Sequence, residues 1–265
     1  MGVNCNADVL RETSQAYVGQ FWLRKRVKAL LKKWYGTDNA QVREAWIEKT
    51  LKELPKGNRL LDAGAGELQY KRFCGHLRYV SQDFGQYDGM GDGSGLQMGS
   101  WDNSQTNIIS DIINIPEPDA SFDAIMCIEV LEHLPAPIEA LREFCRLLHP
   151  GGVLILTAPF ASLTHLAPYH FYSGFNRNFY IKWLDELGFA IAELVPNGNY
   201  FEFLRQELTR VRAIGKRYTR KRRVLSALEY LALFVIARAL KRLSSSDIGS
   251  DSLLCYGYMV KAIKI

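Results

Sequence analysis

Two carboxylates and one imidazole occur within five consecutive residues of this sequence. Glu129, Glu132 and His133 stand at positions i, i+3 and i+4, so an α-helix would place their side chains on one face. Carboxylate oxygens and imidazole nitrogens are ligands of divalent metals, and such a site takes a further ligand from elsewhere in the chain. The same side chains can also simply cap and pack a helix. We favour this structural interpretation, because short motif matches often occur without a bound metal.

Two further histidines, His165 and His170, lie beside Tyr169 and Tyr172 in a segment expected to be a loop. An imidazole titrates near neutral pH and can take a proton from a hydroxyl group that acts as a nucleophile. A lone histidine is more often structural, but two of them with two tyrosines in one loop favour an active site. We therefore expect His165 and His170 to supply a general base.

A glycine motif predicts where a ligand binds. Two leucines lead into Asp62, and Gly64 and Gly66 follow at a spacing of one residue. This pattern predicts a buried strand that ends in a tight turn, where glycine lets the backbone come close to a ligand. Asp83 lies 21 positions after Asp62 and ends the next predicted strand, where an acid can accept hydrogen bonds from two ribose hydroxyls.

The elements that must position these residues alternate from residue 59 onward. Predicted strands cover 60–62, 77–83, 108–110, 120–127, 153–157, 189–195 and 253–265. Predicted helices cover 40–54, 69–76, 137–148 and 177–187, and the glycine-rich segment 85–100 is predicted to be a loop. Alternation of this kind indicates an α/β fold with a doubly wound sheet and helices on both faces. Ligands bind such a sheet outside the carboxyl ends of its strands, where Gly64, Asp83 and Asp111 stand.

The predicted organisation has four parts. Residues 1–39 form a helical cap with a helix over 16–35, and 40–200 form the ligand-binding core. Residues 201–250 form a helical insertion, and 251–265 add the last strand to the core sheet. Within the insertion, 224–243 is an apolar helix whose length approaches that of a membrane span. We reject a span, since one crossing cannot return 251–265 to the sheet. The helix is predicted to be a lid over the active site or to lie in a membrane interface.

Charge and cysteine content restrict the partners and the compartment. The net charge is +5, but 21–33 carries six Lys/Arg and 210–223 carries eight, with no acid in either run. Each run is either a solvated helix face or a site for an anionic partner, such as a membrane surface, a phosphorylated substrate or nucleic acid. Five scattered cysteines without a CxxC pair argue against a zinc site or disulfides. With no apolar leader segment visible, we expect a cytoplasmic protein that can contact an anionic membrane peripherally.

Three longer segments are similar to those of a known family. They are Phe-Asp-Ala-Ile-Met-Cys-Ile-Glu-Val-Leu-Glu-His-Leu-Pro at 122–135, Leu-Leu-His-Pro-Gly-Gly at 147–152 and Leu-Thr-Ala-Pro at 156–159. In this order after the glycine motif, they resemble the class I S-adenosylmethionine (SAM)-dependent methyltransferases, specifically the type 11 group. The resemblance covers residues 59–200 and implies a Rossmann-like sheet of seven strands, the last antiparallel, with SAM as cofactor. One departure is Leu68, where the family often has a third glycine.

The resemblance also implies which residues contact SAM, in groups that follow the first four strands. They are Asp62, Gly64, Ala65 and Gly66 at the amino-acid part; Asp83 at the ribose and Phe84 beside the adenine; Asp111 and Ile112 at the adenine; and Cys127 to Glu129 near the methionine moiety.

Residues 129–133 resemble the E-x-x-E-H segment of ubiquinone-pathway O-methyltransferases and of small-RNA 2′-O-methyltransferases. In those enzymes these residues bind a metal that holds the acceptor hydroxyl, and in the RNA enzymes a further histidine follows strand five. The resemblance implies Glu129, Glu132, His133 and His170 as candidate metal ligands, and it adds Glu129 to His165 and His170 as a catalytic candidate. Many type 11 members carry a similar segment without a known metal, so a divalent metal is not favoured beside SAM.

These features predict a SAM-dependent methyltransferase that methylates oxygen on a small-molecule, lipid-linked or glycan acceptor. No N/D-P-P-Y tetrapeptide, typical of nucleic-acid amino-methyltransferases, is present. An RNA ribose 2′-O-methyltransferase is the first alternative, but no recognisable RNA-binding module accompanies the core. A non-catalytic partner protein with the methyltransferase fold is the second. Its signature would be loss of the cofactor acids, yet Asp62, Asp83 and Asp111 are all present.

Overall fold

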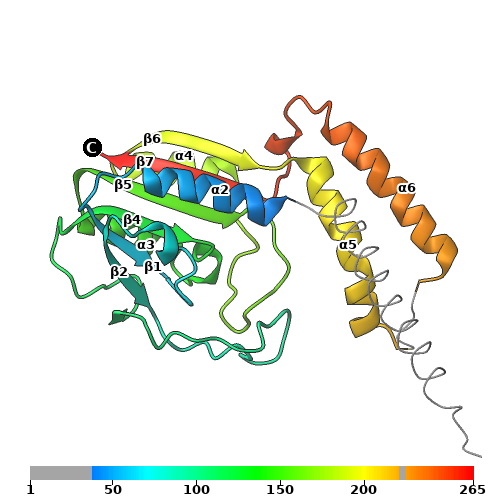
Figure 1. The fold of residues 1–265 in the computed structure, drawn as a ribbon, viewed down its shortest axis with the longest axis horizontal. Helices are drawn as coiled ribbons and strands as arrows, with labels where there is room; N and C mark the ends of the chain where they lie inside the picture. The colour runs from blue at the N-terminus through cyan, green and yellow to red at the C-terminus, as the bar shows by residue number, and fades with distance from the viewer. Residues whose placement is uncertain (1–37, 221–224) are drawn as a thin grey trace, which may run out of the picture. The chain divides into compact units, whose positions relative to one another are not determined.

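The computed structural model describes residues 38–220 and 225–265 (Figure 1). The predicted helix 16–35, the basic run 21–33 and nearly all of the predicted cap lie outside the described residues. The chain forms two compact units. One, here called the core unit, comprises Asp38–Phe203 and Asp247–Ile265; the other, here called the helical unit, includes Leu204–Ser246.

A seven-stranded sheet is the centre of the core unit, with the strand order β3-β2-β1-β4-β5-β7-β6. The strands are β1 (Arg59–Ala63), β2 (Arg78–Asp83), β3 (Ile108–Ile109), β4 (Phe122–Ile128), β5 (Leu148–Pro159), β6 (Phe189–Asn197) and β7 (Gly257–Lys264). β1 to β5 pair in parallel, whereas β7 runs antiparallel between β5 and β6. The predicted fold class, a doubly wound sheet with its last strand antiparallel, is confirmed.

Helices cover both faces of this sheet (Figure 1). They are α2 (Asn39–Lys52), α3 (Pro137–Leu147) and α4 (Arg177–Glu186), with short 3-10 turns η1 (Lys71–Phe73), η2 (Leu131–His133) and η3 (Ser250–Ser252). α3 begins with Pro137, whose fixed φ suits the first helical turn. α4 begins after Asn176, whose side chain accepts a hydrogen bond from the N–H of Phe179.

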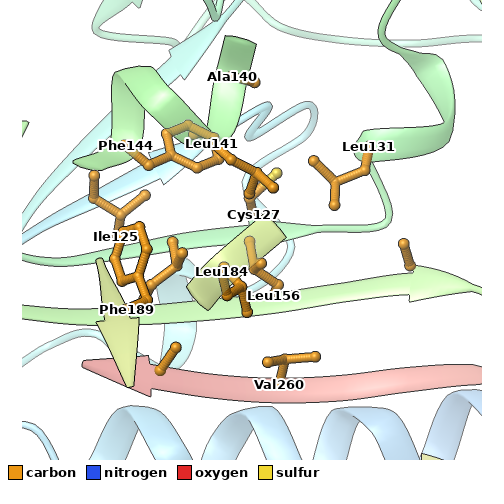
Figure 2. Packing of buried hydrophobic residues seen from close by; sticks show 14 of the residues in the cluster. Ile125, Cys127, Leu131, Ala140, Leu141, Phe144, Leu156, Leu184, Phe189 and Val260 are labelled. Carbon is orange, nitrogen blue, oxygen red and sulfur yellow. The ribbon is translucent and has the colours of Figure 1, made fainter. Parts of the chain in front are cut away.

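β4 separates two hydrophobic clusters because successive side chains of a strand point to opposite faces. Ile125 and Cys127 belong to the cluster that also contains Leu141 of α3 and Leu184 of α4 (Figure 2). Met126 belongs to the other cluster, which includes residues of α2. The carboxyl ends of the parallel strands are thereby held between two packed layers, which fixes the loops that follow them.

Three local predictions are wrong. Residues 129–133 are not an α-helix: Glu129 has a left-handed φ of 56°, and only Leu131–His133 form a single 3-10 turn. The cause is the sheet, because the N–H of Glu129 still donates to the carbonyl of Thr157 before the chain turns away. The predicted helix 69–76 contains only the 3-10 turn η1. β5 begins before the predicted 153, where Gly151 with φ 79° allows an irregular start opposite Phe122.

Two helices belong to the insertion, α5 (Tyr200–Tyr218) and α6 (Ala227–Ser244). They lie side by side (Figure 1), and the guanidinium of Arg212 stands 5.6 Å from the centre of the Tyr230 ring. α6 starts with a capping box between Ser226 and Glu229. Among the described residues, no helix combines the length and the apolar character that crossing a bilayer requires.

Candidate active site

The turn after β1 depends on its glycines. Gly64 has φ 76°, and a Cβ there would lie 2.6 Å from the side chain of Val130. Gly66 has φ 49°, and a Cβ there would lie 2.5 Å from the indole of Trp101. Leu68, which replaces the family's third glycine, keeps a left-handed φ of 58°. The turn therefore retains a glycine-like path without the third glycine, which leaves the predicted cofactor turn intact.

Asp83 ties this turn to the end of β2. Its Oδ2 accepts from the N–H of Gly66 at 3.0 Å, and its Oδ1 accepts from the N–H of Gly85 at 2.9 Å. A carboxylate offers about four lone-pair positions, so Asp83 keeps the capacity to accept from ribose hydroxyls. The next residue, Phe84, packs edge-on against Tyr169 with ring centres 4.9 Å apart.

Asp62 is buried rather than open at the sheet edge. Its Oδ2 accepts a hydrogen bond of 2.5 Å from the hydroxyl of Tyr79. Burial raises the pKa of Asp62 to about 7. Its carboxylate is therefore held inside the sheet by Tyr79, near the end of β1.

The other predicted cofactor residues divide into exposed and buried ones. Asp111 is exposed, and its Oδ1 accepts from the N–H of Ile113 at 3.2 Å, whereas Ile112 packs into the core. Cys127 is fully buried within the same cluster (Figure 2). The alternation along β4 thus turns the thiol of Cys127 into the core.

Four side chains gather beyond the ends of β4 and β5. We call Glu132, His133, His165 and His170 the histidine cluster. Oε1 of Glu132 lies 3.7 Å from Nε2 of His133 and 4.0 Å from Nε2 of His165. The ring centres of His133 and His165 are 4.6 Å apart, and those of His165 and His170 are 4.8 Å apart. The structure therefore brings together both predicted catalytic histidines, His165 and His170, and three of the four predicted metal ligands, Glu132, His133 and His170.

Hydrogen bonds fix the orientation of these imidazoles. Nδ1 of His133 donates to the carbonyl of Tyr169, and Nδ1 of His165 donates to the carbonyl of Leu163 at 2.8 Å. A neutral imidazole that donates from Nδ1 keeps its lone pair on Nε2, and in both residues Nε2 is the nitrogen near Glu132. Desolvation lowers the pKa of His133 to about 4, so this ring is neutral at pH 7.

Glu132 is a buried acid that lacks a hydrogen-bond partner for one carboxylate oxygen within the described chain. Its side chain is 1% exposed, and the oxygen concerned is Oε2. Burial raises the pKa of Glu132 well above its usual range. Together with Nε2 of His133 and Nε2 of His165, its carboxylate forms a set of three ligand atoms within 4.8 Å of one another. Such a donor set fits a divalent cation.

Glu129 does not join this cluster. Its Oε2 accepts from Nη1 of Arg43 at 2.9 Å, and its Oε1 accepts from the hydroxyl of Thr157 at 2.8 Å. The structure therefore does not bring Glu129, a predicted metal ligand, into this cluster, and His165 stands beside Glu132 and His133 in its place. The physical reason is the left-handed backbone at Glu129. In an α-helix this residue would have a right-handed φ, and its side chain would share a face with Glu132 and His133.

Arg43 is a site residue that the sequence analysis missed. It stands four residues before Ile47 and eight before Leu51, which are both buried, so it lies on the apolar face of α2. A cation at a core-facing position of a predicted helix is the sequence feature that could have identified Arg43 as a site residue. Arg43 and Glu129 line a small cavity together with Tyr258 and other residues of β7.

The glycine-rich segment 85–100 holds the loop that carries His165. The N–H of Leu96 donates to the carbonyl of Thr164 at 3.0 Å, and the N–H of Leu166 donates back to Leu96 at 2.8 Å. A Cβ at Gly95 would lie 2.5 Å from that same Thr164 carbonyl oxygen. The predicted loop is therefore correct as a loop, but its role in placing His165 was not foreseen.

Comparisons with known proteins agree with this geometry. A family model described as a methyltransferase domain matches residues 35–210. A ubiquinone biosynthesis O-methyltransferase of Xanthomonas oryzae is 51% identical over 41 residues, which is 16% of this chain and 17% of that protein. A 27-O-demethylrifamycin SV methyltransferase of Amycolatopsis mediterranei is 43% identical over 47 residues, 18% of this chain and 17% of that protein. The matches thus span about a sixth of the length of these curated relatives.

Solved structures agree in fold at low sequence identity. A protein from Galdieria sulphuraria assigned as a sarcosine dimethylglycine methyltransferase has a TM-score of 0.51 with 14% identity, over 83% of this chain and 84% of that one. The family match covers well over half of the chain and includes the glycine turn, Asp83 and the histidine cluster. The chain therefore belongs to the methyltransferase domain family, and its core unit has the fold of the class I SAM-dependent methyltransferases.

Proposed function

We propose that the protein transfers the methyl group of SAM to an oxygen atom, with the histidine cluster on the acceptor side. The observation that carries this proposal is the position of the cluster. His133 is bonded to Tyr169, and Tyr169 packs on Phe84, which directly follows the predicted ribose acid Asp83. The cluster is thus linked to the predicted cofactor loops by two contacts.

His170 is the residue proposed as general base. The Ser162 hydroxyl donates its one hydrogen to the carbonyl of Ser173 at 2.8 Å, so its oxygen accepts from Nε2–H of His170 at 3.1 Å. This arrangement leaves the lone pair of His170 on Nδ1. Burial lowers the pKa of His170, which keeps the ring neutral and able to accept a proton. His165, beside it, is the second candidate.

The proposed step forms a bond from the acceptor oxygen to the methyl carbon and breaks the bond from that carbon to the sulfonium sulfur. S-adenosylhomocysteine leaves, and the acceptor proton passes to the imidazole. Because the sulfonium is already an activated donor, the main task of the protein is to hold the acceptor oxygen in line with it.

The methionine end of SAM is assigned to the pair Arg43 and Glu129. Glu129 directly precedes Val130, whose side chain packs on Gly64 of the cofactor turn. A guanidinium suits the carboxylate of an amino acid, and a carboxylate suits its ammonium group. Both charges of the pair are partly exposed and line a cavity, so they can exchange partners when the cofactor binds.

The histidine cluster also fits a divalent cation, and Glu132, His133 and His165 would hold it. When bound, such an ion would polarise the acceptor oxygen and lower the pKa of its hydroxyl. The unpartnered Oε2 of Glu132 is the observation in favour of this variant of the proposal.

Oxygen as the acceptor atom is supported by the names of the two short-matching relatives, which both methylate oxygen. The acceptor classes proposed are a small molecule, a lipid-linked compound or a glycan. Met90, Met98 and Phe171 are exposed apolar side chains near the histidine loop and its neighbour, and they suit an acceptor with an apolar part. RNA methylation stays the alternative, and salt-sensitive RNA binding would favour it. The predicted site of action is the cytoplasm.

The test is transfer of labelled methyl from SAM to lipid and glycan extracts by wild type, His170→Ala and His149→Ala. His149 is exposed at the start of β5, at the far end of the sheet from the cofactor turn. Loss of a general base should lower turnover about 100-fold or more, while SAM affinity measured by calorimetry stays within about twofold. His149→Ala should match wild type in both. Unchanged turnover in His170→Ala would overturn the assignment of the base, and failure of wild type to bind SAM would overturn the proposal itself.

A further inference from the structure

The helical unit carries an exposed apolar face that has no role in the function proposed above. Five large side chains of α6 are between 48% and 76% exposed: Leu228, Leu231, Val235, Ile236 and Leu243. At 3.6 residues per turn they fall within an arc of roughly 140°. Ala237, which is buried, lies opposite that arc. We call these five side chains the α6 face (α6 is orange in Figure 1).

Cations border the α6 face. Arg238 follows Val235 by three residues and Arg242 follows it by seven, so both lie along one edge of the face, and both are exposed. Glu229 is the single acid of the helix. An apolar stripe with arginines at its margin is the pattern of a helix that lies in a membrane interface, because the long arginine stems let the charge reach the headgroups.

Charge is concentrated in the same unit. Residues 204–246 contain twelve Lys/Arg and two Glu, a net charge of +10. Removing these from the 33 cations and 28 acids of the whole chain leaves 21 cations and 26 acids, so the rest is net negative. On α5, Arg212, Lys216 and Arg217 are exposed. A cationic unit on an otherwise acidic protein favours an anionic surface as partner over a second copy of the same chain, since two such units would repel each other.

From these observations we propose that α6 binds the surface of an anionic lipid bilayer, with the α6 face inserted between headgroups and acyl chains. The apolar side chains supply the insertion, and the basic residues of α5 and α6 supply the preference for anionic lipid. α6 lies along the surface and does not cross it, which agrees with the finding that no described helix is suited to span a bilayer. This inference is independent of the reaction proposed above.

The test is co-flotation of the full chain with vesicles of phosphatidylcholine alone and of phosphatidylcholine with phosphatidylglycerol. We expect flotation with the anionic vesicles and its decrease in high salt, because screening weakens the attraction to headgroups. The variant Leu228→Ser/Leu231→Ser/Val235→Ser should lower the fraction bound about tenfold or more. Arg238→Gln/Arg242→Gln should reduce the preference for anionic vesicles.

Two controls separate loss of the surface from loss of the fold. The triple change of the same positions to alanine preserves helix propensity and should give the same loss with unchanged far-ultraviolet circular dichroism. Ile248→Ser/Leu253→Ser alters two residues that are 102% and 73% exposed but lie outside α6, and it should float like wild type. Retention of wild type in the soluble fraction with every vesicle would overturn the proposal. So would a lipid-free dimer that the triple variant dissociates, because the α6 face would then bind a second copy.

Discussion

Nη1 of Arg43 lies 2.9 Å from Oε2 of Glu129, and this ion pair joins α2 to the residue that follows β4. The other carboxylate oxygen of Glu129 accepts from Thr157. Both oxygens of Glu129 are therefore engaged, one by α2 and one by β5, and Glu129 does not join His133 and His165. The acidic residue that a helical motif would have assigned to a metal instead forms, with Arg43, a pair of opposite charges suited to the amino-acid part of SAM.

Arg43→Gln tests that assignment. A hydrogen bond to a charged group contributes about 1.5–3 kcal/mol, so we expect the Kd for SAM to rise about 10- to 100-fold. Isothermal titration calorimetry with SAM measures the effect. Arg72→Gln is the matched control, because Arg72 forms an ion pair of 2.7 Å with Glu44 of α2 on an exposed surface. Wild-type affinity in Arg43→Gln would refute the assignment, and an equal loss in both variants would point to a general effect on α2.

Gly95→Ala tests whether segment 85–100 positions His165. The new Cβ would lie 2.5 Å from the carbonyl oxygen of Thr164, and the φ of Gly95 is +62°, so the neighbouring loop must shift. Misplacing a reacting group lowers turnover, and we expect kcat to fall about tenfold or more with SAM affinity within about twofold. The pair of values comes from steady-state kinetics and calorimetry.

Gly93→Ala is the control for that change. Gly93 also has a left-handed φ, +76°, but no atom lies within 4 Å of its added Cβ. It therefore introduces the same backbone strain without the collision. Turnover near wild type is expected for Gly93→Ala. Equal losses in the two variants would show that strain, and not the position of His165, explains the effect.

Local patterns were sufficient to predict the sheet and the cofactor turn. The burial of β1 and β4 follows from short apolar runs, and Gly64 and Gly66 adopt positive φ where the motif requires it. Such features depend on residues close in sequence, which is why alternation and motif spacing recover them. The number of strands follows from the same patterns, and the antiparallel last strand follows from the family resemblance.

The composition of the histidine cluster depended on distant contacts instead. Glu129 turns away because its N–H is bonded to Thr157, 28 residues later, and its carboxylate finds Arg43, 86 residues earlier. His165 enters because Leu96 pairs with the loop on both sides of it. Periodicity within a short window carries no information on such contacts. The expected helix over 129–133 therefore paired Glu132 with Glu129, whereas the structure places His165 beside Glu132.

Asp62→Asn tests the buried acid of β1 through the pH dependence of stability. Burial raises the folded-state pKa of Asp62 to about 7, whereas an unfolded aspartate has a pKa of about 3.9. The folded protein therefore binds this proton more tightly than the unfolded chain does. The resulting stabilisation is fully present below about pH 4 and is lost as pH rises through about 7.

Asparagine can still accept from Tyr79 but does not ionise. We expect the free energy of unfolding of Asp62→Asn, relative to wild type, to increase between pH 4 and pH 8 by a few kcal/mol, at ~1.4 kcal/mol per pKa unit. Urea unfolding without cofactor at several pH values measures it. Asp102→Asn is the control, because hydrogen bonds from Ser104 lower the pKa of Asp102, so its effect falls below about pH 4 and its difference from wild type should stay constant between pH 4 and pH 8. A difference that does not vary with pH would show that Asp62 is ionised throughout.

Addition of Co²⁺ alone tests the donor set of the histidine cluster. Imidazole nitrogens and carboxylate oxygens bind Co²⁺, and its visible absorption reports the ligands directly. We expect a bound ion in wild type and a weakening of at least ~10-fold in His133→Ala and in His165→Ala, since loss of a ligand or of its support costs that much. Glu129→Gln should bind Co²⁺ like wild type, because both of its oxygens are engaged by Arg43 and Thr157. His149→Ala, exposed and remote, controls for binding by surface histidines.

If Glu129→Gln abolished Co²⁺ binding, the ion would require a rearrangement that frees Glu129 from Arg43. If wild type bound none, the cluster would act through its imidazoles alone, and His170 would have to supply the base without help from an ion.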